Sequence, residues 1–144
     1  LSEREGVLDR SVLLLGRLPK RESEALLSAS AMTLALFTGP RIVWRDAVQN
    51  KFFDSLAAGV PVANNFDGWQ ARIAVEAGGG LILSATDVDA GARQLVAKLR
   101  DPGWMSTARR AARELAVTKF DRDLLGAQLA RLLEATVAEG AGRP

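Results

Sequence analysis

The chain has 144 residues, of which 48% are hydrophobic and 25% are charged, and its formal net charge is +2. This composition is typical of one globular domain and excludes a disordered chain, and no apolar run reaches the ~20 residues of a membrane span. Cysteine and histidine are both absent, which excludes a disulfide scaffold, thiol catalysis, histidine-based triads and an ordinary zinc site. The small positive charge gives no argument for nucleic acid, so we expect no such partner.

The chain begins with a pattern typical of a helix end, in which Gly6 is the C-cap residue. Because only the end of such a helix is present, we expect upstream elements to be missing. Short apolar runs predict strands at 12–15, 32–37, 60–63 and 81–83. Helical spacing, caps and breakers predict helices at 19–30, 51–58, 69–77, 87–99, 104–117 and 121–137.

Strands therefore alternate with helices until the last three helices. This order predicts an α/β fold, with a Rossmann-like parallel sheet covered by helices on both faces and extra helices at the C-terminus. We expect one nucleotide-binding domain at 1–137 and a disordered tail at 138–144. Ligands of such sheets bind beyond the carboxyl ends of the strands. The longest loop at that edge, residues 37–50, is the first place to look for a site.

The helix predicted after this loop carries the strongest chemical signal. Asn50 is predicted to cap it, and its free amides and dipole favour an anion such as a diphosphate. Lys51 adds a positive charge, and Asp54, one turn further, is placed to accept hydrogen bonds from the paired hydroxyls of a ribose. The alternative is an ordinary capped helix with a solvated Lys–Asp face, and the residues alone leave both interpretations open.

The run Asn-Lys-Phe-Phe-Asp-Ser-Leu-Ala-Ala-Gly-Val-Pro-Val at 50–62 resembles the C-terminal half of family-4-type glycosyltransferases of the GT-B fold. It is most similar to bacterial enzymes that build surface polysaccharides. Asp46 and Asp54 match the two acidic positions of the family's Glu-x7-Glu motif, although both are Asp here. The resemblance implies that Asp54 holds the ribose of a nucleotide donor and that Asp46 contacts hydroxyls of the donor sugar. The amides around Asn50 and Lys51 would hold the diphosphate.

The resemblance covers nearly the whole chain. Residues 14–20 are similar to the family's strand–turn before a helix, which implies that Gly16 approaches the nucleobase. Residues 66–70 correspond to a glycine-containing loop, which implies that Gly68 and Trp69 lie near the diphosphate and the transferred sugar. Residues 79–83 match a further strand, and the last helices match the closing helical region. The family's basic clamp after the first strand of this domain has no counterpart here.

The resemblance thus implies that the chain is one half of a GT-B fold. It also implies that the protein is an enzyme, a retaining glycosyltransferase, and that this chain is its donor-binding half. Its partners would be a nucleotide diphosphate sugar and an N-terminal acceptor domain that is missing here, so we expect this chain alone to be inactive. We expect no metal and no cofactor. The expected setting is polysaccharide or glycoconjugate synthesis in the cytoplasm, with the full-length enzyme a candidate for peripheral association with the inner face of the cell membrane.

The alternative function is a non-catalytic Rossmann-like module that binds a nucleotide or a protein partner. A signalling domain of the response-regulator type is disfavoured, because neither its acidic pocket after the first strand nor its lysine after the fifth is evident.

The two Asp-x-Asp sequences, at 87–89 and 121–123, resemble a metal–diphosphate motif, but each starts a helix, and we interpret both as caps. Arg109, Arg110 and Arg113 predict a solvated basic face. Trp104 is expected to anchor a helix, whereas Trp69 either lines a sugar or base pocket or packs in the core.

Overall fold

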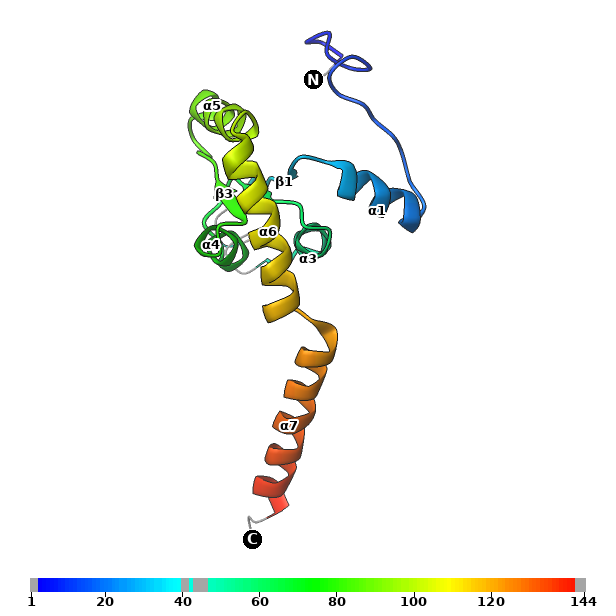
Figure 1. Cartoon of the computed structure of the whole chain (residues 1–144), viewed down its shortest axis with the longest axis vertical. Helices are drawn as coiled ribbons and strands as arrows, with labels where there is room; N and C mark the ends of the chain where they lie inside the picture. The colour runs from blue at the N-terminus through cyan, green and yellow to red at the C-terminus, as the bar shows by residue number, and fades with distance from the viewer. Residues whose placement is uncertain (1–2, 40–41, 43–46, 142–144) are drawn as a thin grey trace.

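A computed structural model of the chain describes residues 3–39, 42 and 47–141 (Figure 1). The strands of the sheet are β1 (Thr33–Ala35), β2 (Val62–Asn64) and β3 (Gly80–Ile82). The helices of the first half are α1 (Lys20–Ala29), α3 (Asn50–Ala57) and α4 (Trp69–Glu76). Those of the second half are α5 (Val88–Leu99), α6 (Pro102–Lys119) and α7 (Arg122–Ala141).

The strands form one parallel sheet in the order β1-β2-β3. Thr33 pairs with Val62, and Val62 pairs in turn with Gly80. The crossovers from β1 to β2 and from β2 to β3 each contain a helix, α3 and α4 respectively, as parallel neighbours require. The starts of α3 and α4 therefore lie at the carboxyl edge of the sheet.

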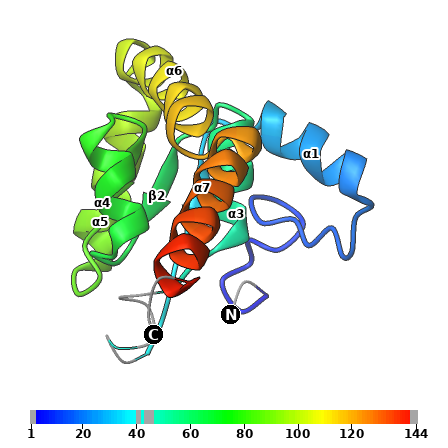
Figure 2. The same ribbon diagram turned by 90° about the horizontal axis from the view of Figure 1, so that it is seen from below.

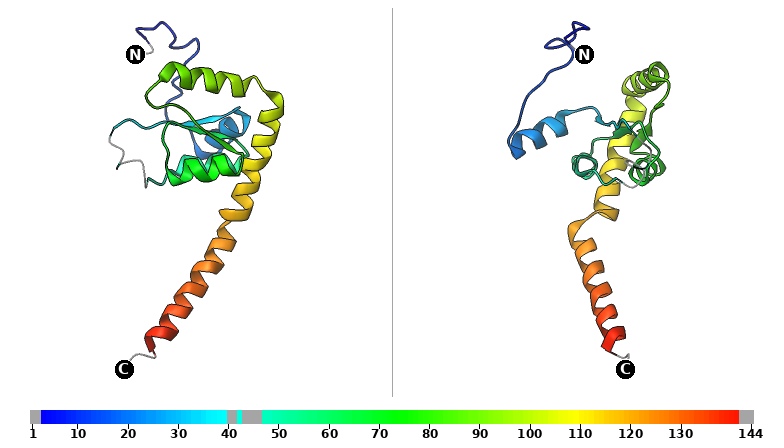
Figure 3. Two further views of the ribbon diagram at one scale, coloured as in Figure 1. Left: turned by 90° about the vertical axis from the view of Figure 1, so that its left-hand side faces the viewer. Right: turned by 180° about the vertical axis from the view of Figure 1, so that it is seen from behind.

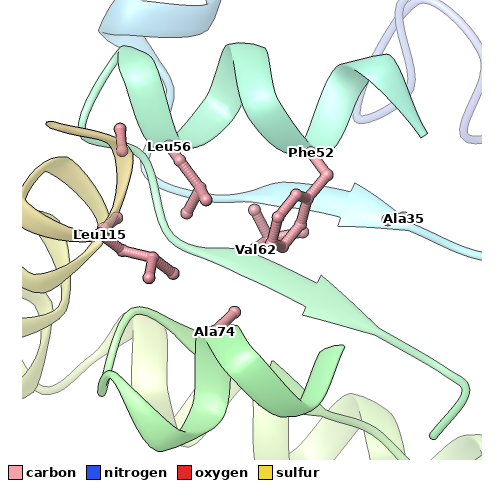
Figure 4. Close-up of a cluster of buried hydrophobic side chains, with 8 residues drawn as sticks. Ala35, Phe52, Leu56, Val62, Ala74 and Leu115 are labelled. Carbon is pink, nitrogen blue, oxygen red and sulfur yellow. The ribbon is translucent and has the colours of Figure 1, made fainter. Parts of the chain in front are cut away.

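One face of the sheet is covered by α3, α4 and the middle of α6. Its core is made by Phe52 and Leu56 from α3, Val62 from β2, and Ala74 and Leu115 from α4 and α6 (Figure 4). Phe52, Leu56 and Val62 are at most 1% exposed. Fully burying an aliphatic or aromatic side chain of this size stabilises a fold by about 1.5–3 kcal/mol, so this cluster fixes α3 against the sheet.

The opposite face is covered by α5 (Figure 3). Ala63, Leu81 and Leu83 form its buried cluster, with Leu95 and Trp104 packed against them. The ammonium of Lys98 lies 5.3 Å from the centre of the Trp104 ring. Trp104 thus anchors the start of α6, as predicted, and helices on both faces of a parallel sheet confirm the predicted α/β class.

The basic residues of α6 hold other helices in place. The guanidinium of Arg109 donates to the carbonyl oxygens of Ser30 at 2.8 Å and Ser28 at 3.2 Å, at the end of α1. Arg113 donates to the carbonyl oxygen of Ala57 at 2.6 Å, at the end of α3. Cations are favoured at helix C-termini, where carbonyls lack partners. Arg110 and Arg113 are exposed, as the predicted solvated face requires, whereas Arg109 is half-buried. Arg109 and Arg113 in addition bind the ends of α1 and α3.

The caps predicted for the Asp-x-Asp sequences are confirmed. The Asp87 carboxylate accepts from the amide of Ala90 at 2.8 Å, and that of Asp121 accepts from the amide of Leu124 at 3.0 Å. Asp101 caps α6 in the same way through the amide of Trp104. Both motifs are thus explained by helix capping.

The strand predicted at 12–15 is not formed. Val12 makes only an isolated bridge with Leu8, and Leu13, Leu14 and Leu15 are 63%, 75% and 53% exposed. Residues 3–6 form a turn, in which the amide of Gly6 donates to the carbonyl of Glu3, rather than the predicted helix end. The segment before α1 stands apart from the sheet (Figure 1), and α1 lies on the side of α3 that is away from α4 (Figure 2), so the apolar run makes no pair with a strand.

The last helix, α7, projects away from the sheet (Figure 3). It continues to Ala141, four residues past the expected domain limit at 137, and residues 142–144 lie outside the described part of the chain. Its predicted apolar stripe is exposed, from 38% at Leu124 to 71% at Val137. Among the described helices, none combines the length and the apolar character that crossing a bilayer requires.

Candidate functional site

The starts of α3 and α4 are joined by a pair of amide contacts. The side-chain oxygen of Gln70 accepts from the backbone amide of Gln49 at 3.0 Å, and its side-chain nitrogen donates to the carbonyl of Gln49 at 3.4 Å. Gln70 is 1% exposed. A buried side chain that pairs with both backbone groups of one residue fixes that residue in place. The two helix starts therefore form one rigid unit at the carboxyl edge.

A second amide holds the other end of the loop between β1 and α3. The side-chain oxygen of Asn65 accepts from the amide of Phe37 at 2.8 Å, and its nitrogen donates to the carbonyl of Phe37 at 2.8 Å. This pair continues the β1–β2 ladder by one step with a side chain in place of backbone. The loop that contains Asp46 is thus held at both ends, by Asn65 and by Gln70, whereas Asp46 itself lies outside the described residues.

The first turn of α3 differs from the predicted one. Gln49, with φ −104° and ψ 123°, is the N-cap residue, Asn50 is already helical, and no side chain caps the helix. The prediction that Asn50 is the cap is therefore wrong. The amide of Phe52 donates to the carbonyl of Gln49 at 3.1 Å, so it is not one of the free amides. Within the described residues, the amides of Asn50 and Lys51 are left without an acceptor.

The start of α4 also lacks a side-chain cap. Its N-cap residue is Gly68, whereas Asp87 and Asp101 cap α5 and α6. Arg72 lies one turn into α4 and makes an exposed ion pair of 3.6 Å with Asp67. Two neighbouring helix starts therefore present uncapped amides at the same edge, and the side chain of Lys51 is exposed beside them. This arrangement favours an anion.

Two buried side-chain amides at this edge lack an acceptor. They are the side-chain nitrogens of Asn64, which ends β2, and of Gln49. Asn64 is 1% exposed. A buried donor without a partner costs free energy, and among the described residues no acceptor faces either nitrogen. Both nitrogens are closed off from the surface.

The remaining predicted site residues are placed in different surroundings. Asp54 is exposed and borders a hollow of about 270 Å³ between α3 and α1, lined also by Glu24, Leu27 and Ser28. Trp69 is half-buried in an aromatic cluster, with ring centres 6.4 Å from Phe52 and Phe53 and 6.5 Å from Phe120. Of the two interpretations of Trp69, core packing matches these contacts.

The structure therefore brings together Asn50, Lys51, Gly68 and Trp69 but not Gly16. Gly16 is exposed in the segment before α1, and a Cβ placed on it would have no neighbour within 4 Å. Sequence reasoning missed Gln49, Asn64, Asn65 and Gln70. Gln70 lies four residues before Ala74, on the buried face of α4. This helical spacing is the sequence signal that predicts a buried position for Gln70. Asn64 and Asn65 directly follow a buried strand, which is a weaker signal.

No family model and no curated protein matches this chain. The site is therefore interpreted from its own chemistry.

Proposed function

We propose that this chain is the donor-binding part of a retaining glycosyltransferase, and that the starts of α3 and α4 hold the diphosphate of a nucleotide diphosphate sugar. The observation that carries the proposal is the pair of adjacent uncapped helix starts, joined by Gln70 and flanked by exposed Lys51. The resemblance of residues 50–62 to family-4-type enzymes supports the same assignment. The rest of the proposal is a cytoplasmic setting in polysaccharide synthesis, and an acceptor domain as partner.

The proposed role of the protein groups is electrostatic. Amides that point at a leaving diphosphate stabilise the charge that develops on it, without a proton transfer. Asn50 and Lys51 would contribute two such amides, and Lys51 one cation. Asp54 lies one turn further along the exposed side of α3, where its carboxylate can accept from ribose hydroxyls.

Titration calorimetry of the chain with a panel of nucleoside diphosphates, nucleotide sugars and inorganic pyrophosphate tests the proposal. Binding of nucleoside diphosphates, with pyrophosphate binding more weakly, is the expected result. Absence of binding across the panel would contradict a donor site. Binding of a nucleotide without any diphosphate requirement would favour the non-catalytic module instead.

Replacing Asn50 by proline should weaken nucleoside diphosphate binding about ten- to a hundredfold, because a hydrogen bond to a charged group is worth about 1.5–3 kcal/mol. Proline removes the amide, is accepted at the first helical position, and requires an extended residue before it. Gln49 already has that conformation. Asn50→Ala is the control, since it keeps the amide and should bind normally. Equal affinities for the two variants, measured by calorimetry, would exclude this amide as a ligand.

Asp54→Asn should weaken nucleoside diphosphate binding about tenfold and leave pyrophosphate binding unchanged, because only the nucleoside carries a ribose. The loss follows from a charged acceptor becoming a neutral amide, at about 1–2 kcal/mol per hydrogen bond pair. Glu24→Gln, across the hollow that Asp54 borders, is the control for a general change of charge. An equal loss for both ligands would contradict a ribose contact.

A further inference from the structure

Four aromatic rings meet beside the starts of α3 and α4. Phe52 and Phe53 lie near the start of α3, and Trp69 is the first residue of α4. The fourth ring comes from a third element, because Phe120 is the residue that ends α6. Its ring centre lies 5.1 Å from that of Phe53 and 6.5 Å from that of Trp69. Phe120 therefore contacts both of the helices that begin at the carboxyl edge.

The contacts of Phe120 have the geometry of a packed interior. Its ring plane is inclined by 76° to that of Phe53 and by 61° to that of Trp69. Aromatic rings at these distances and angles attract each other beyond the effect of the area that they bury. Phe52 is 1% exposed and lies 6.1 Å from Phe120, while the other three rings are half-buried. Close packing of this kind fixes each ring relative to the others.

The start of α4 has few other large side chains to hold it. The buried residues of α4 are Gln70, Ala71 and Ala74. The alanines bury little apolar area, and Gln70 is paired with Gln49, which precedes α3. Trp69 is thus the large apolar side chain that connects the start of α4 to the body of α3, and Phe120 closes this connection from α6.

We propose that Phe120 is a positioning residue for the candidate site, and that its ring sets the separation between the starts of α3 and α4. Phe53 follows Lys51 by two residues and Trp69 directly follows Gly68, so a displaced ring moves the amides at the edge. Hydrogen bonds weaken steeply away from their ideal geometry, and a binding site tolerates little displacement of its donors. The fixing of the helix starts is independent of the proposed function, whereas its effect on anion affinity rests on that function.

Hydrogen exchange, followed by NMR, tests the fixing of the helix starts. The reporters at the helix starts are amides that donate within them, and the references are amides that donate within the sheet. Phe120→Ala should raise the ratio of reporter to reference exchange rates about tenfold, because it opens the helix starts without opening the sheet. Phe120→Leu keeps most of the apolar bulk, so it folds, and should raise the ratio about threefold. The reporters are the amides of Gln49, Phe52 and Arg72, and the references are those of Val62 and Leu83.

Two further variants separate positioning from general stability. Phe120→Tyr keeps the ring and should restore the ratio of the parent. Leu115→Ala removes apolar bulk from the same helix and the same core cluster but leaves the four rings in place. It should speed exchange in both sets alike. An unchanged ratio in Phe120→Leu, or an equal rise in Leu115→Ala, would overturn the proposal.

Calorimetry with inorganic pyrophosphate tests the effect on the site. Phe120→Leu should weaken pyrophosphate binding about tenfold, which corresponds to the loss of one amide hydrogen bond to a charged group, whereas Phe120→Tyr and Leu115→Ala should bind as the parent does. Unchanged affinity in Phe120→Leu, with a raised exchange ratio, would overturn the role of Phe120 in the site. If the parent does not bind pyrophosphate, it is the proposed function that fails, and the exchange ratio alone decides whether Phe120 sets the two helix starts.

Discussion

Gln70→Glu should lower the free energy of unfolding by about 2–4 kcal/mol at neutral pH, since each pKa unit by which burial raises the new carboxyl is worth about 1.4 kcal/mol. The substitution keeps the shape of the side chain and the acceptor for the Gln49 amide. It replaces the nitrogen that donates to the Gln49 carbonyl by an oxygen, in a residue that is 1% exposed. A charged carboxylate there faces a carbonyl oxygen without a donor between them.

The pH dependence gives this prediction its sign. Burial raises the folded-state pKa of the introduced carboxyl above its unfolded value of ~4.3. Below pH ~4.3 the carboxyl is protonated in both the folded and the unfolded state and can donate to Gln49, so the stability of the variant should approach that of the parent. As the pH rises from the unfolded-state pKa through the raised folded-state pKa, the loss of stability should grow. Urea unfolding at pH 4 and pH 7 measures it. Gln94→Glu is the control, because Gln94 is exposed and donates to Ile82 at 3.3 Å. A pH-independent loss would contradict the proposed amide contact.

Gly80→Ala should cost about 1–3 kcal/mol, the usual range for overpacking a tight core. A Cβ on Gly80 would lie 2.7 Å from the Cβ of Ala74 and 3.1 Å from the carbonyl oxygen of Val62. Both neighbours belong to the buried cluster that holds α4 on the sheet. The clash would therefore be relieved only by moving α4 away from β2 and β3, and with it the start of α4 at the site.

Gly126→Ala is the matched control for Gly80→Ala. A Cβ on Gly126 meets nothing within 4 Å, and the residue lies inside α7. Alanine is the better helix former, by about 0.8–1.0 kcal/mol, so this variant should unfold at the same denaturant concentration as the parent or a higher one. Equal destabilisation by both substitutions would show that helix packing against β3 is not the cause.

Most of this fold is predictable because helix caps and helix-breaking residues are local signals in the sequence. Pro102 and the caps Asp87, Asp101 and Asp121 give the helix boundaries of the second half within a few residues. Three of the four predicted strands are present, since each is buried by helices that the chain itself supplies. The strand at 12–15 fails for the opposite reason. Its leucines are apolar enough, but strand formation also requires a paired neighbour, and hydrophobicity alone says nothing about pairing.

The candidate site is only partly predictable. The helix start at Asn50 and Lys51 follows from strand–loop–helix order, which places it at the carboxyl edge. The predicted cap, Asn50, lies one residue after the observed one, because Asn is a common cap residue whereas Gln49 makes no side-chain cap. The pairing of Gln70 with Gln49 joins residues that lie 21 positions apart. No local pattern reports such a contact, because it depends on the angle between two helices.

The exposed helix α7 can lose its helical structure while the packed core of the sheet stays intact. Every residue from Arg122 to Ala138 is exposed, so this helix draws its stability from its own backbone bonds and cap. Most of the stability of helices in proteins comes from tertiary packing, which this part of α7 lacks. Loss of α7 by fraying thus requires no disruption of the sheet core around Phe52 and Val62. The amides of α7 and those of the sheet accordingly belong to different cooperative units, with the lower opening free energy in the helix that contains the most residues.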